Sequence, residues 1–168
     1  MDEVITDPDI GETQGLGVLR AAPAVGAVLM SLVLAHLPPF RRAGRALLVS
    51  VAIFGVTMVG FGLSRNFLLS IALLAASGMA DTVSVVIRST LLQVLTPDHL
   101  LGRVSAVNAI FIGSSNEIGA FESGAAARLI GTVPAVVFGG LATLVVVGVT
   151  AVKVPALRRL KQIAATSQ

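Results

Sequence analysis

Residues 132–152 read TVPAVVFGGLATLVVVGVTAV and contain no charged side chain. A helix needs about 20 mostly apolar residues to cross the roughly 30 Å of hydrocarbon in a bilayer. Four more stretches of similar length lie between polar breaks, at residues 16–37, 43–63, 67–95 and 102–127. The sequence therefore predicts an all-α fold, a polytopic transmembrane helical bundle of about five spans.

The composition agrees with a membrane protein and excludes several functions. Only 12% of the 168 residues are charged and 55% are hydrophobic, whereas a soluble domain carries about 25% charged residues. There is no Cys, and His36 and His99 are the only histidines, so we expect no metal site and no cofactor. The aromatic residues are all Phe, which argues against nucleic acid as a partner. Motifs for ATP hydrolysis and for the familiar hydrolases are absent, so no enzyme is expected.

Lysine and arginine predict the orientation, because they accumulate in short loops on the cytoplasmic side. Eight of them fall on one predicted face: Arg41, Arg42, Arg45, Arg103, Lys153, Arg158, Arg159 and Lys161. Only Arg65 and Arg128 fall on the other face. We therefore expect an extracytoplasmic acidic lead-in over residues 1–15, a membrane domain over 16–152 and a cytoplasmic basic tail over 153–168.

The third predicted span carries a polar stripe at helical spacing, formed by Ser77, Asp81, Ser84 and Arg88. A continuous polar stripe on an apolar helix is what a translocation path needs. In the alternative interpretation, Asp81 pairs with a neighbouring helix and Arg88 extends to the cytoplasmic interface. Both interpretations remain open for Asp81, and the structural one is favoured for Arg88.

The fourth predicted span is the least apolar, since it contains Asn108, Asn116, Glu117 and Glu122. Such groups face a bundle interior or a water-filled cavity, so we expect spans three and four to be inner helices. A glutamate here could take up a proton when buried and release it when opened to water. Structural pairing of Glu117 or Glu122, for example with Arg20 or Arg88, is the favoured alternative.

Three basic features outside these spans have simple interpretations. Arg20 lies about one turn inside the first span, where it either meets an anionic substrate or, as we favour, extends outward to the interface. The loop containing Arg41, Arg42 and Arg45 is a topology determinant that also meets anionic lipid headgroups. The basic tail is a solvated or surface-lying segment.

Several motifs, taken in this order, resemble the C-terminal half of a major facilitator superfamily transporter. They are GLGVLRAAPAVGA (15–27), RRAGR (41–45), DTVSVVIRST (81–90), TPDHLLGRVSAVN (96–108) and NEIGAFESG (116–124). The nearest likeness is to the enterobactin-exporter-like and drug-efflux-like branch. It extends from about residue 15 to residue 160.

This resemblance implies a role in transport. Members have two six-helix halves with a central path at their interface, and the five spans resemble helices eight to twelve. The loop carrying Arg41, Arg42 and Arg45, together with Arg103, resembles the basic cytoplasmic side of the second half. The resemblance implies that the chain is part of a transporter. The complete transporter would export a siderophore or drug-like molecule across the bacterial inner membrane by proton coupling, and a partner half would supply the missing helices. The alternative is a truncated, non-transporting membrane fragment or interaction subunit.

Overall fold

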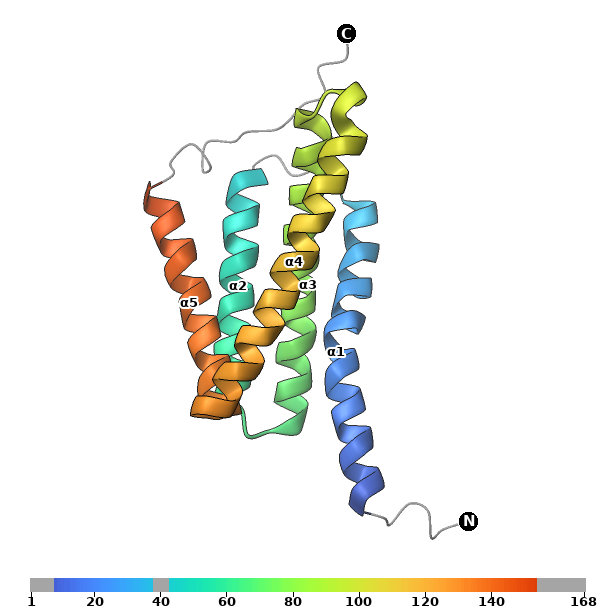
Figure 1. Ribbon diagram of the computed structural model, residues 1–168. Coiled ribbons are helices and arrows are strands. Elements are labelled where there is room, and N and C mark those ends of the chain that lie inside the picture. The colour runs from blue at the N-terminus through green and yellow to red at the C-terminus, as the bar shows by residue number, and fades with distance from the viewer. Residues whose placement is uncertain (1–7, 38–42, 154–168) are drawn as a thin grey trace.

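The computed structural model describes residues 8–37 and 43–153, and these ranges form five helices with no strand (Figure 1). The helices follow one another up and down the long axis of the molecule. Their bounds are α1 Pro8–His36, α2 Ala43–Leu63, α3 Phe67–Leu95, α4 Asp98–Ile130 and α5 Thr132–Lys153. The predicted all-α bundle is confirmed.

The helix bounds agree closely with the sequence where polar residues interrupt the apolar runs. Helices α2 and α3 have the predicted bounds, and α5 ends one residue later than predicted, at Lys153. Helix α1 begins at Pro8, so it includes part of the predicted acidic lead-in. Arg41, Arg42 and residues 154–168 lie outside the described residues.

Two short connections fix how the helices reverse direction. Asn66 caps α3, because its side-chain oxygen accepts hydrogen bonds from the backbone N–H groups of Leu68 (3.0 Å) and Leu69 (3.4 Å). Gly131 alone separates α4 from α5 and has a φ of 89°, a conformation that side chains rarely adopt. These turns make α2–α3 and α4–α5 antiparallel hairpins.

Helix α3 is the most buried of the candidate spans, and the helices pack on one another in the order α1, α3, α2, α5 and α4. The side chains buried on α3 are small or of moderate size, and several carry hydroxyl groups: Ser70, Ser77, Ala80, Val83, Ser84 and Ile87. Small residues let membrane helices approach closely, and buried hydroxyls bond to the preceding turn. Ser77, for example, donates to the carbonyl of Leu74 at 2.7 Å. Large apolar side chains are mostly on the outside.

Two helix crossings depend on glycine. A Cβ on Gly26 of α1 would collide with the backbone of Ala75 in α3, and a Cβ on Gly78 would collide with the backbone of Pro23. At the second crossing, between α2 and α5, a Cβ on Gly140 would lie 2.9 Å from the carbonyl oxygen of Gly55. Backbone therefore lies against backbone at both places.

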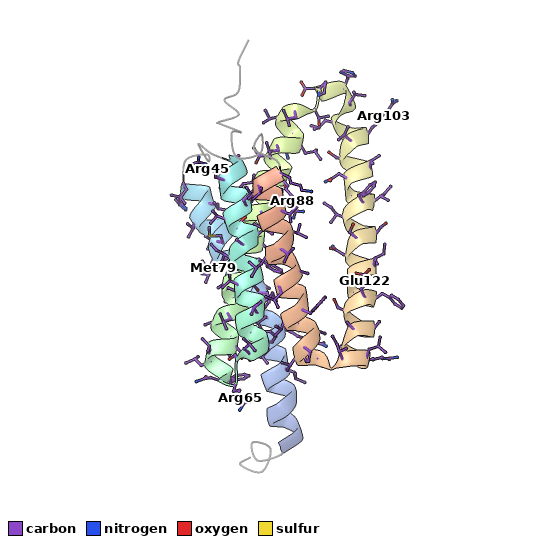
Figure 2. All side chains as sticks on the ribbon, turned by 90° about the vertical axis from the view of Figure 1, so that its left-hand side faces the viewer. Arg45, Arg65, Met79, Arg88, Arg103 and Glu122 are labelled. Carbon is purple, nitrogen blue, oxygen red and sulfur yellow. The ribbon has the colours of Figure 1, made fainter. Side chains whose placement is uncertain are left out.

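Within the described ranges, four helices are long and apolar enough to span a membrane: residues Gly15–His36 of α1, all of α2, all of α3 and all of α5. Helix α4, although 33 residues long, is the most polar of the five and has no buried residue. It packs mainly against α5 and stands apart from the other helices in Figure 2. The predicted inner position is therefore confirmed for α3 and wrong for α4 in the part of the chain that the structure describes. The reason is that no described helix covers the polar faces of α4, and even Phe121 is 78% exposed.

Candidate functional site

Asp81 and Arg88 are the charged residues near the middle of the central helix α3, and both are exposed. The guanidinium of Arg88 turns back along the helix, because its Nε donates a hydrogen bond of 3.4 Å to the carbonyl of Ser84. This hydrogen bond holds the base of the guanidinium against the preceding turn of α3. The extension of Arg88 to the interface stays a prediction.

Two cavities lie on either side of this pair of charges. One, of about 230 Å³, lies between α2, α3 and α5, and Ser50, Ser84 and Thr143 contribute hydroxyl groups to its wall. The other, of about 290 Å³, lies between α3 and α4 and is lined by polar groups of Ser115 and Asn116. Asp81 and Arg88 line both cavities. The two charged residues therefore belong to the walls of both cavities.

Two further cavities extend this arrangement toward both ends of the molecule. A cavity of about 400 Å³ between α3 and α4 is lined by Arg103 and Asn108, and it shares Phe111 with the α3–α4 cavity already described. A cavity of about 550 Å³ between α2, α4 and α5 shares Phe54 and Thr143 with the 230 Å³ cavity. The four cavities thus form a row from the Arg103 end of α4 to its turn into α5.

The structure brings together four of the seven transport candidates predicted from the sequence. Asp81, Arg88, Asn108 and Asn116 all line cavities of this row. The other three, Arg20, Glu117 and Glu122, are exposed and line none of these four cavities (Figure 2 labels Glu122). The predicted pairing of a glutamate with Arg20 or Arg88 is not formed among the described residues.

Several cavity residues were missed by the sequence analysis, and Phe54, Phe111 and Thr143 are the three of them that line two cavities each. Phe54 and Thr143 lie near the middles of α2 and α5, and each lines two cavities. Thr143 could have been suspected from the sequence, because it is one of few polar residues in an uncharged span. Nothing in the sequence around Phe54 indicates that it lines a cavity. In the described ranges, no group of three or more His, Asp or Glu side chains is arranged to hold a metal ion.

Three of the described basic residues lie at the ends of the bundle, grouped as the sequence predicted. Arg45 and Arg103 lie at one end and Arg65 at the other (Figure 2). Long apolar helices crossing in alternate directions, with exposed apolar side chains outside, define a multi-pass α-helical membrane protein. Which end faces the cytoplasm stays a prediction.

The sequence is similar to those of bacterial enterobactin exporters. The enterobactin exporter EntS of Citrobacter koseri is 29% identical over 147 residues, which make up 88% of this chain and 35% of that protein. The exporters of the same name from Shigella flexneri and Escherichia coli are 27% identical over 147 residues, or 36% and 35% of their lengths. These exporters are major facilitator superfamily transporters, so the predicted resemblance is confirmed.

The matched region is most of this chain but only a part of each exporter. The chain spans about a third of the length of the curated relatives it matches. No family model matches it, and no solved structure matches it. The relatives are named as exporters and not as enzymes.

Proposed function

We propose that this chain is part of a secondary active transporter that exports a small molecule, siderophore-like or drug-like, from the bacterial cytoplasm by proton exchange. The observation that carries the proposal is the position of Asp81 and Arg88 on helix α3, where both residues line two neighbouring cavities. Charged groups within a membrane are costly, and those that line a wet space commonly serve a substrate or ion path. The similarity to enterobactin exporters supports the same class of activity.

The proposal includes a partner half. Helix α4 has no buried residue and is too polar to face lipid along its whole length. A set of further helices packed on α4 would cover it and close the row of cavities into a path. The N-terminus is outside and the C-terminus cytoplasmic in this proposal, which follows the distribution of Lys and Arg.

A secretion experiment tests transport and the partner half together. Cells that lack their own enterobactin exporter would express this chain, the part of the Citrobacter koseri exporter outside the matched 147 residues, or both as separate polypeptides. We expect enterobactin in the medium, or extrusion of ethidium, only when both are present. Export by this chain alone would refute the need for a partner half, and no export of either compound in any arm would refute the transport proposal.

Charge-removing variants test the path in the combination that transports. Asp81→Asn and Arg88→Gln should each lower export about tenfold or more, because each removes a charged contact within the membrane. Asp98→Asn and Arg65→Gln are matched controls, since both residues are exposed and line none of the four cavities. In proteoliposomes with an imposed pH gradient, Asp81→Asn and Glu117→Gln should remove the response to the gradient. Normal pH-dependent export by both variants would rule out their role in proton coupling.

A further inference from the structure

The cavity of about 400 Å³ between α3 and α4 carries a single kind of charge. It is lined by Leu92 of α3 and by Arg103, Val104, Val107, Asn108 and Phe111 of α4. Four of these six side chains are apolar, Asn108 is neutral, and none of the described residues that line the cavity is acidic. The cavity therefore combines an apolar wall with one positive charge.

The acidic residues nearest to this cavity along the two helices belong to other surfaces. Asp98 precedes Arg103 by five residues in α4, which places it about 140° away around the helix. Asp81 of α3 lines two other cavities and does not line this one. Arg103 is therefore the charged group that this cavity presents to a ligand.

The depth of these groups matches the layers of a bilayer. Helices α4 and α5 meet at Gly131, and α5, with 22 residues, is long enough to cross the hydrocarbon. Twenty-two residues counted back from Gly131 along α4 reach residue 109, so Asn108 lies near the hydrocarbon boundary. Arg103 lies about 7.5 Å beyond Asn108, at one end of the bundle and at the level of the headgroups (Figure 2). Phe111 lies on the hydrocarbon side of the boundary.

The apolar wall of the cavity is accessible from the bilayer. Val107 is 57% exposed and Phe111 is 72% exposed, because α4 packs mainly against α5 and has no buried residue. A hydrocarbon chain in the surrounding bilayer can therefore reach this wall without passing through water. A small aqueous anion would contact Arg103 and leave the apolar wall without a partner.

We infer that this cavity is a binding site for an anionic phospholipid, whose phosphate binds Arg103 and whose acyl chain lies against Val107 and Phe111. Basic pockets between membrane helices bind anionic headgroups, whereas a zwitterionic headgroup brings its own cation and gains less from Arg103. Ile110 and Glu117 line none of the four cavities, so the α4 surface around them stays available to the proposed partner half. The inference does not rest on the proposed function, because lipid binding is measured without transport.

Quenching of a single tryptophan in lipid vesicles tests this site, because the chain has no Trp. Phe111→Trp places the fluorophore in the cavity wall, and Ile110→Trp is the matched control at nearly the same depth outside the cavity. Phosphatidylglycerol or phosphatidylcholine with brominated acyl chains is titrated into vesicles of unbrominated phosphatidylcholine. At Phe111→Trp we expect phosphatidylglycerol to bind about fivefold more tightly than phosphatidylcholine, the preference that one arginine near the surface supplies. At Ile110→Trp we expect the two lipids to quench equally.

Two arginine variants assign the preference to the headgroup contact. In the Phe111→Trp chain, Arg103→Gln should remove the preference for phosphatidylglycerol. Arg128→Gln is its control and should leave the preference unchanged, since Arg128 is in the last turn of α4 and lines none of the four cavities. Val107→Trp is a second reporter from the same wall. Circular dichroism confirms that each variant keeps its helix content.

Three results would overturn the inference. Equal preferences at Phe111→Trp and Ile110→Trp would show a general attraction of anionic lipid to the basic end of the bundle. A preference that survives Arg103→Gln would show that Arg103 does not bind the headgroup. Water-soluble glycerophosphoglycerol has the same headgroup without acyl chains, and relief of quenching by it would assign the cavity to an aqueous anion. None of these results depends on the secretion experiment, and a failure of secretion leaves the lipid measurement unaffected.

Discussion

The crossing of α1 and α3 at Gly26 should be sensitive to a single methyl group. A Cβ on Gly26 would lie 2.8 Å from the carbonyl carbon of Ala75 and closer still to its oxygen. Carbon atoms in favourable contact are about 3.5–4.0 Å apart, so α1 and α3 would have to separate by about 1 Å. The contact is with backbone and not with a flexible side chain, so local repacking cannot relieve it. We expect Gly26→Ala to lower the free energy of unfolding by about 1–3 kcal/mol, the cost of overpacking.

Gly17→Ala is the matched control for Gly26→Ala, because Gly17 is in the same helix and a Cβ there would meet nothing within 4 Å. This control should be neutral or stabilising by up to about 1 kcal/mol, because alanine favours the helix more than glycine does. Unfolding of the purified chain in mixed micelles by increasing dodecyl sulfate, followed by circular dichroism, measures both values. If Gly26→Ala is as stable as Gly17→Ala, α1 and α3 do not approach through this glycine and the proposed packing is wrong.

Two turn residues give further predictions. Asn66→Ala removes the cap of α3 and should lower the stability of this helix end by about 1 kcal/mol. The loss should be seen as faster hydrogen exchange at the amides of Leu68 and Leu69. Unchanged exchange would show that water caps the helix equally well. Gly131→Ala should cost about 1–3 kcal/mol, because φ is 89° at this position. Gly102→Ala, in a helical position with open space around it, is the control for thermal unfolding, and equal losses for the two variants would contradict the assigned turn.

The hairpin bounds could be predicted from the sequence because local polar residues set them. Ser64, Arg65 and Asn66 interrupt two apolar runs, and the structure turns at these residues. The polar stripe of α3 was likewise visible, since helical periodicity alone places Asp81 and Arg88 on related faces. Local pattern therefore identified the residues of the candidate site on α3.

Features that depend on contacts between distant segments could not be predicted in this way. Nothing near Phe54 indicates that it shares two cavities with Thr143, because the contact joins α2 to α5. The polar residues of α4 predicted that it faces a bundle interior or a water-filled cavity. They do not indicate which helices cover it. Glycine at position 26 is compatible with both a lipid-facing surface and a tight crossing, and only the position of Ala75 distinguishes them.

The single-residue turn at Gly131 has a consequence for how the protein enters the membrane. Helix α4 contains Glu117 and Glu122, and a charged residue at the centre of a helix opposes insertion by about 2.5–3.5 kcal/mol. Helix α5 is the most apolar of the four candidate spans, and one residue joins it to α4. The connection is therefore too short for α4 to leave the translocation machinery separately from α5. The two helices must partition as one hairpin, with the lipid affinity of α5 retaining its polar neighbour until other helices cover it.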